Sequence, residues 1–201
     1  MIDIYNKIKL FYRTKKAIKA LDSQISFISG RLKYPLDQKD DFEDLMSLNL
    51  FCNLYERDFL ISRKLVLTSN KKELDYHLRQ LALLCFEYME RIQHILSINL
   101  LPAFSKYNLD ESVVSSYKAT NKALGKIRNK HSQYLKDIRN NCAAHRNFDA
   151  MLQVGIIDNL DKDRIMLLAM ELSEFQTMLF NMWSIIIYKK LNYDLDRLKN
   201  A

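Results

Sequence analysis

Apolar residues recur every three to four positions along almost the whole chain, which is the spacing of one face of an α-helix. The first stripe predicts one long helix, or two consecutive helices, ending near Tyr34 and Pro35. A second stripe follows Asp40 and Asp41, whose carboxylates suit a helix N-terminus. It consists of Phe42, Leu45, Leu48, Cys52, Tyr55 and Phe59.

A third helix is predicted to start at Asn70, where Glu73 three residues later completes a pattern typical of a capping box. Pro102 ends this helix. Its stripe consists of Leu74, Leu78, Leu81, Cys85, Tyr88, Ile92 and Ile95.

The fourth predicted helix runs from about Asp110 to Arg146, with Gly125 as its one unfavourable interior residue. Residues 147–158 are expected to be irregular or to form a short helix, with a break at Gly155. A last helix starts near Asp161, and Phe180 and Trp183 are expected to fill the core beside its stripe. That stripe consists of Ile165, Leu168, Leu172, Phe175, Leu179, Met182 and Ile186.

These elements predict an all-α protein, in which residues 1–201 form a single antiparallel bundle of four to six helices. Three glycines and two prolines in 201 residues favour a few long helices over many strands and turns. The most apolar segment, 178–188, is shorter than the roughly 20 residues that span a membrane. Three widely spaced cysteines (Cys52, Cys85 and Cys142) favour free thiols in a reducing compartment. We therefore expect a cytoplasmic protein without a membrane-spanning segment.

The formal net charge of +7 comes from one segment of the chain. Residues 118–146 hold eight basic residues and one acid, Asp137, whereas the rest of the chain holds 23 of each. A charge run is usually a solvated helix face, but this one overlaps a candidate catalytic motif, which favours a phosphate-binding surface. The basic residues are Lys118, Lys122, Lys126, Arg128, Lys130, Lys136, Arg139 and Arg146.

The basic segment closes on Arg139-Asn140-Asn141-Cys142-Ala143-Ala144-His145-Arg146. Arg139 supplies a fixed cation for a phosphate, Asn140 an amide to orient it, and His145 a group that exchanges protons near neutral pH. Arg139, Asn140 and His145 resemble the Arg-Asn-x(3–5)-His signature of the HEPN superfamily, a set of small helical domains rich in metal-independent ribonucleases. The surrounding sequence is most similar to the abortive-infection and toxin branches of that superfamily.

The resemblance implies an endoribonuclease that uses no cofactor and cuts RNA by attack of the 2′-hydroxyl on the adjacent phosphorus. His145 would act as general base or acid, Arg139 would hold the phosphate, and Asn140 would orient the phosphate or His145. Asn141 and Arg146 would support this site. A toxin or antiphage role, with an antitoxin or another partner protein, is also implied. The RNA backbone would be seated by Lys118, Lys122, Lys126, Arg128 and Lys130.

At about 100° per residue, His145 and Arg139 lie on opposite edges of one apolar stripe, so they do not stack on one another as an i, i+4 pair would. Arg139 shares its edge with Arg128 and Arg146, whereas His145 shares its side with Ile127, Tyr134 and Ile138.

A second copy of this helix across a two-fold axis would bring two arginines and two histidines into one cleft. The small residues Cys142, Ala143 and Ala144 would allow the two copies to approach closely. The resemblance implies the same arrangement, because HEPN ribonucleases generally act as homodimers with the motif at the interface.

Simpler interpretations exist for each motif residue. A histidine on an apolar helix face is usually a core residue, and arginines near a helix C-terminus stabilise the helix dipole. Asn140 and Asn141 could be ordinary interface amides. The earlier sequence Ile127-Arg128-Asn129-Lys130-His131 begins like the motif, but His131 follows too soon for the signature. We interpret Arg128 as a candidate phosphate contact and His131 as structural.

Two other classes of function remain open at this level. One is a non-catalytic HEPN-like helical module that binds RNA, a nucleotide or a protein partner, and the other is a purely structural helical dimer. No metal site is predicted, because His77 and His94 lie 17 residues apart without cysteines or acids at ligand spacing. The sequence also contains no glycine-rich phosphate loop.

Overall fold

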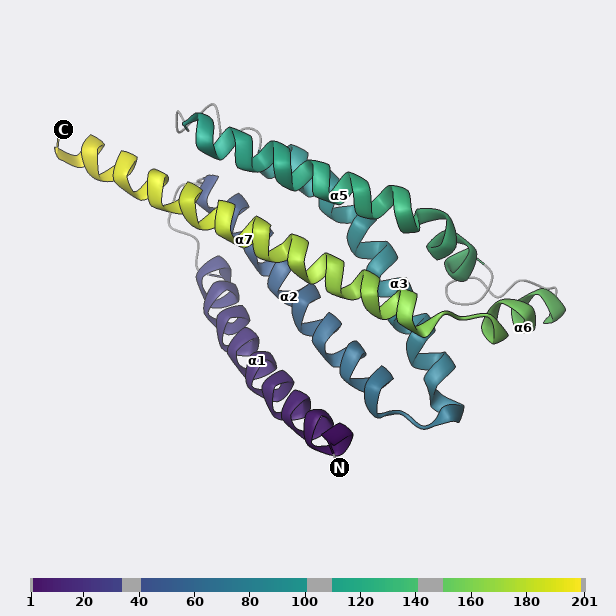
Figure 1. The fold of residues 1–201 in the computed structure, drawn as a ribbon. Coiled ribbons are helices and arrows are strands. Elements are labelled where there is room, and N and C mark those ends of the chain that lie inside the picture. Colours follow the sequence, from purple (N-terminus) through teal and green to yellow (C-terminus); the bar gives the residue numbers. More distant parts are fainter. Residues whose placement is uncertain (1, 34–40, 101–109, 141–149, 200–201) are drawn as a thin grey trace.

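The computed structural model describes residues 2–33, 41–100, 110–140 and 150–199, and the elements in these ranges are all helical (Figure 1). The predicted all-α fold is confirmed, and the first stripe forms one continuous helix. The elements are α1 (Ile2–Lys33), α2 (Asp41–Thr68), α3 (Lys71–Ile95), the π-helical η1 (Leu96–Leu100), α5 (Glu111–Ile138), α6 (Ala150–Asp158) and α7 (Lys162–Lys199).

The core is a bundle of α2, α3, α5 and α7. Both α2 and α5 pack on α3 and on α7, so the four helices close around one interior, and α1 lies against the outside of α2 (Figure 1). The buried positions on α7 are spaced alternately by three and four residues, which is the pattern of coiled-coil packing. Each is at most 1% exposed: Ile165, Leu168, Leu172, Phe175, Leu179, Met182 and Ile186.

Three helices begin where the sequence predicts. Asn70, Asp110 and Asp161 each accept a hydrogen bond, at Oδ1, from the backbone N–H three residues later, at 3.2, 3.2 and 2.9 Å. These bonds satisfy N–H groups that the first turn of a helix leaves without a carbonyl partner.

The start of α5 is also tied to α7. Lys189 Nζ lies 3.0 Å from Asp110 Oδ2. Hydrogen bonds from Ser112, from Lys189 and from the Val113 backbone hold the pKa of Asp110 at about 2. Asp110 is therefore ionised at neutral pH, as an N-terminal cap opposite a lysine requires.

One expectation about helix continuity is corrected. The predicted break at Gly155 is wrong, because α6 runs without interruption from Ala150 to Asp158. An interior glycine costs about 1 kcal/mol relative to alanine, which weakens a helix without ending it, and α5 likewise continues through Gly125. The second helix also extends beyond the predicted stripe, to Thr68.

The outer helix is less buried than its sequence suggests. Ile28 is buried, but Ile18, Leu21 and Ile25 are only partly covered and Phe11 is 38% exposed. The reason is that α1 packs mainly on one neighbour, α2.

Phe180 and Trp183 also differ from expectation, since both lie only partly buried at the edge of the core. The indole Nε1–H of Trp183 donates to the backbone carbonyl of Leu45 at 2.9 Å.

The α-helical part of α5 ends at Ile138, and Arg139 and Asn140 follow in a π-helical turn. The backbone N–H of Arg139 still donates to the carbonyls of Leu135 and Lys136. The rest of the predicted motif helix, residues 141–146, lies outside the described residues.

The buried thiols and the helix lengths agree with the sequence-based expectations. Cys52 and Cys85 are free and buried, and burial raises the pKa of Cys52 to about 12. Cys142 lies outside the described residues. Among the helices that the structure describes, none is both long and apolar enough to cross a membrane.

Candidate functional site

The structure describes two of the three predicted catalytic residues, Arg139 and Asn140. The third, His145, lies outside the described residues, as do Asn141 and Arg146. The small-residue run Cys142-Ala143-Ala144, predicted to border a dimer interface, lies outside them too. The described part of the motif is therefore Arg139 and Asn140, together with the helix that leads to them.

Arg139 is half-buried and directed toward α3. Its guanidinium lies over the ring of Phe86, 5.1 Å from the ring centre, a distance suited to a cation–π interaction. Its Nη1–H donates to Asn140 Oδ1 at 3.3 Å. A guanidinium has five N–H donors in a rigid plane, so one contact to Asn140 is compatible with a bidentate grip on a phosphate.

A polar cleft between α3 and α5 lies on the same side of α5 as Arg139. Arg128 and Lys136 line it, Arg139 follows three residues after Lys136, and all three fall within about 80° on the helix. The cleft has a volume of about 460 Å³. Its remaining lining residues are Glu90, Gln93, Asn121, Leu124, Gly125, Asn129 and Ser132.

Arg128, which lines this cleft, forms an exposed ion pair with Glu90. Arg128 Nη2 lies 3.3 Å from Glu90 Oε1, and the two side chains are 32% and 48% exposed. Ion pairs this exposed contribute about 0–1 kcal/mol, so a phosphate can compete with Glu90 for Arg128. The shared edge predicted for Arg128 and Arg139 is confirmed, because both contact α3.

The predicted lysine ridge divides into two parts. All four lysines are exposed, but Lys130 is also paired: its Nζ lies 2.6 Å from Glu171 Oε1 on α7. Each step of four residues turns the side chain by about 40°, so Lys130 has rotated about 120° from Lys118. The ridge thus passes from the solvent-facing side of α5 to the α7 side.

His131 is part of the core, in agreement with the structural interpretation of the earlier Arg-Asn sequence. It is 1% exposed, and its Nε2 lies 2.9 Å from Glu171 Oε2. Burial lowers the pKa of His131, and the hydrogen bond to Glu171 opposes that effect without cancelling it. His131 is therefore neutral at pH 7, donates Nε2–H to Glu171, and is inaccessible to a substrate.

A second arginine–aromatic stack lies on the opposite side of α5. The guanidinium of Arg164 lies 4.2 Å from the ring centre of Tyr134, and Arg164 Nη2–H donates to the carbonyl of Lys130 at 3.3 Å. The Tyr134 hydroxyl accepts from the backbone N–H of Asp161 at 3.0 Å. This cluster joins α5 to the start of α7. Because Arg164, like Arg139, lies over an aromatic ring but outside the proposed site, it can serve as a control residue for Arg139.

Sequence reasoning missed the site residues that α3 supplies, Phe86 and Glu90. No local pattern marks them, because they become neighbours of α5 only when the bundle forms. Ser132 and Lys136 were not assigned to the cleft from the sequence. They follow Arg128 by four and eight residues, and this spacing places their side chains on the same face of the helix as Arg128.

In the parts of the chain that the structure describes, no group of three or more histidine, cysteine, aspartate or glutamate side chains is arranged to hold a metal ion. Comparisons of the chain with protein families, with curated proteins and with solved structures find no match. The geometry of the chain itself must therefore carry any functional argument.

The buried His131 makes fold stability depend on pH. Its pKa in the folded state lies below the ordinary value of 6.5, so the unfolded chain binds more protons as the pH falls through that value. We expect the free energy of unfolding to decrease between pH 7.5 and pH 5, and to decrease less in His131→Gln, whose amide can still donate to Glu171. Urea unfolding at a series of pH values measures both. Equal decreases in the two proteins would contradict the assignment.

Proposed function

We propose that this protein is a metal-independent endoribonuclease whose site is formed by Arg139, Asn140 and His145. The observation that carries the proposal is the position of Arg139. It lies beside Asn140 directly after the last residue of the basic helix α5, on the side of α5 that lines a polar cleft with Arg128 and Lys136. A phosphodiester bound along that cleft would reach Arg139.

The reaction requires one nucleophile, one proton acceptor, one proton donor and one cation. The RNA 2′-hydroxyl loses its proton to a base and bonds to the adjacent phosphorus, and the bond from phosphorus to the 5′-oxygen breaks. An acid protonates that oxygen, so the products are a 2′,3′-cyclic phosphate and a free 5′-hydroxyl. In this proposal Arg139 stabilises the added negative charge on the phosphorane and Asn140 keeps the guanidinium oriented.

His145 is the proposed proton-transfer group because a histidine suits that role and because His131 on α5 does not. An unperturbed histidine titrates near pH 6.5, close to the working pH of a general acid or base. His131 is buried against Glu171 and cannot reach a substrate.

The proposed biological setting follows from the resemblance to abortive-infection and toxin branches of the HEPN superfamily. It is an effector of toxin–antitoxin or antiphage systems that acts in the cytoplasm and is restrained by an antitoxin or another partner protein. A homodimer with the motif at its two-fold axis is part of the same proposal.

Cleavage should survive EDTA and be lost in both Arg139→Ala and His145→Ala. General acid–base catalysis contributes about 10²–10⁴-fold and charge stabilisation at the phosphate about 10²–10³-fold, so either substitution should bring activity close to background. The measurement is gel analysis of labelled RNA and of the matching DNA, which lacks the 2′-hydroxyl and should stay intact.

Two matched variants control for folding. Arg164→Ala removes the arginine–aromatic stack on Tyr134 of α5, and His131→Gln removes the buried histidine of α5; both should retain cleavage. A requirement for added magnesium, or activity persisting in His145→Ala, would refute the mechanism. A folded protein that binds RNA without cutting it would favour a non-catalytic RNA-binding module.

RNA affinity should depend mainly on Lys118, Lys122 and Lys126 of the lysine ridge. Each phosphate neutralised on a single strand contributes about 0.7 to the slope of log affinity against log salt. Replacing Lys118, Lys122 and Lys126 by glutamine should lower that slope by about 2. Lys130→Gln should lower it less than one of these lysines does, because Lys130 pairs with Glu171, a carboxylate that the buried His131 also holds in place. Fluorescence anisotropy at several salt concentrations measures the slope. An unchanged slope in the triple variant would show that these three lysines do not contact RNA.

If the proposed homodimer forms, the protein in solution should have twice the mass of one chain. Sedimentation at micromolar concentration should give a dimer of the 23.9 kDa chain, and Ala143→Arg should shift it toward monomer by placing a long charged side chain at the predicted two-fold axis. Cleavage should fall in parallel, since each site would need both copies. A wild-type protein that stays monomeric and still cuts RNA would exclude a shared site.

A further inference from the structure

A second cavity lies on the far side of α2 from the α3–α5 cleft, between α1, α2 and α7. Both α1 and α7 pack on α2 but make little direct contact with each other, and the cavity occupies the space between them. Its volume is about 700 Å³, within the range of roughly 300–1,000 Å³ typical of small-molecule sites.

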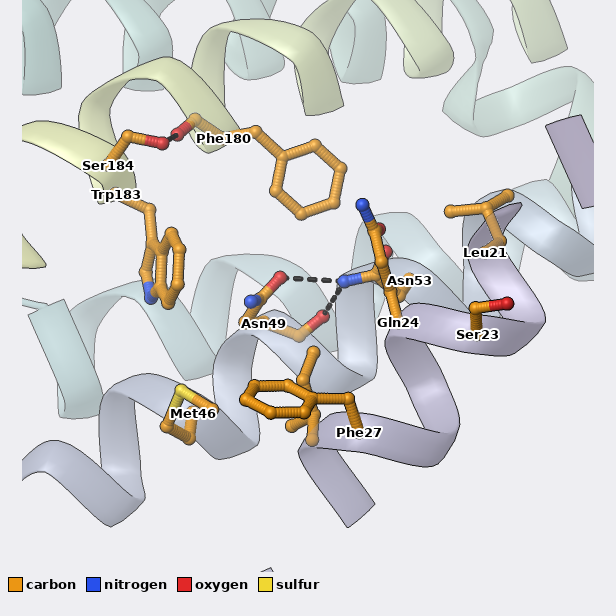
Figure 2. A pocket seen from close by; sticks show the side chains of 11 residues that line it. Leu21, Ser23, Gln24, Phe27, Met46, Asn49, Asn53, Phe180, Trp183 and Ser184 are labelled. Carbon is orange, nitrogen blue, oxygen red and sulfur yellow. Dashed lines mark hydrogen bonds between the residues drawn. The ribbon is translucent and has the colours of Figure 1, made fainter. Parts of the chain in front are cut away.

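Aromatic rings form the walls of this cavity and amides lie at its base. Figure 2 shows Phe27 from α1 and Phe180 and Trp183 from α7 around one space, with Asn49 and Asn53 of α2 between them. Phe27 is 67% exposed, so its ring is accessible to a molecule bound in the cavity.

The amides include an unsatisfied acceptor. Asn53 is 2% exposed, and its Nδ2–H₂ donates to the carbonyl and to the Oδ1 of Asn49, at 2.8 and 2.6 Å. Its own Oδ1 has no hydrogen-bond partner among the described residues. Buried amide oxygens are normally paired, so a bound group that donates a hydrogen bond would stabilise this arrangement.

The charge of the lining selects the class of occupant. Every lining side chain that the structure describes is neutral. A charged ligand would lose its hydration here without gaining a counter-charge, which is strongly unfavourable. RNA, the proposed substrate of the other site, is excluded by the same argument.

We propose that this cavity is a binding site for a neutral, mainly aromatic small molecule that carries a hydrogen-bond donor. The rings of Phe27, Phe180 and Trp183 enclose its aromatic part, and Asn53 accepts from its donor. The site is separate from Arg139 and does not depend on the ribonuclease proposal.

Trp183 is the single tryptophan of the chain, so its fluorescence reports on the cavity directly. The probe is N-phenyl-1-naphthylamine, which is neutral, aromatic and carries one N–H. Titration into the full-length protein should quench Trp183 and increase probe emission, saturating at one probe per chain. Absence of saturable quenching, or one probe per two chains, would overturn the proposal, the latter by assigning the probe to an interface between copies.

A chemically matched probe tests the neutrality of the site. 8-Anilino-1-naphthalenesulfonate has the same aromatic skeleton with one added sulfonate. It should bind at least about tenfold more weakly, because the lining offers the sulfonate no counter-charge. Equal or tighter binding of the sulfonate would show that the probe binds without selection for a neutral molecule, as on any exposed apolar surface, and would refute the proposal.

Matched variants on α1 locate the probe. Phe27→Ala removes one wall and should weaken probe binding roughly five- to tenfold, whereas Tyr12→Ala removes an equally exposed aromatic residue (66%) of the same helix and should leave binding unchanged. Ser184→Leu narrows the cavity from α7 and should also weaken binding, so the test stands if one variant folds poorly by circular dichroism. Equal effects of Phe27→Ala and Tyr12→Ala would overturn the assignment.

Discussion

The structure depends on the burial of four apolar stripes, one on each of α2, α3, α5 and α7, against one another. Each stripe repeats at intervals of three or four residues, so each helix can present a continuous seam to two neighbours. The fully buried side chains include Phe59 on α2, Tyr88 on α3, Leu124 on α5 and Phe175 on α7. Once these seams meet, the rotation of every helix about its own axis is determined.

The rotation of α5 divides its polar residues among three environments. Arg128, Lys136 and Arg139 turn toward α3, where Phe86 and Glu90 meet them. Lys130 and His131 turn toward α7, where Glu171 binds both. Lys118, Lys122 and Lys126 stay exposed. One helix thus carries a candidate phosphate-binding edge, two residues held by a carboxylate of α7 and a solvent-facing ridge, although its sequence is a single basic run.

The two Arg-Asn sequences, one within α5 and one directly after its end, illustrate why local motifs need tertiary context. Both begin Ile-Arg-Asn and both precede a histidine. The first histidine, His131, falls on the buried stripe and donates to a carboxylate of another helix, which makes it a structural residue. The second arginine, Arg139, leaves the α-helix in a π-helical turn beside Asn140 and rests on an aromatic ring. Wider turns of this kind often occur at functional positions.

The sequence by itself determined the all-α class, the three capped helix starts at Asn70, Asp110 and Asp161, and the apolar seams of the core, because these depend on neighbours within one or two helical turns. It also placed Arg139 and Arg128 on one edge of α5, since helical rotation is a local property. Only the tertiary structure decided that Glu171 neutralises Lys130 and holds His131, that Phe86 supports Arg139, and that α1 and α7 leave a neutral cavity over α2. Those contacts join residues on different helices, and nothing in the spacing along one helix specifies which side chain of another will lie opposite.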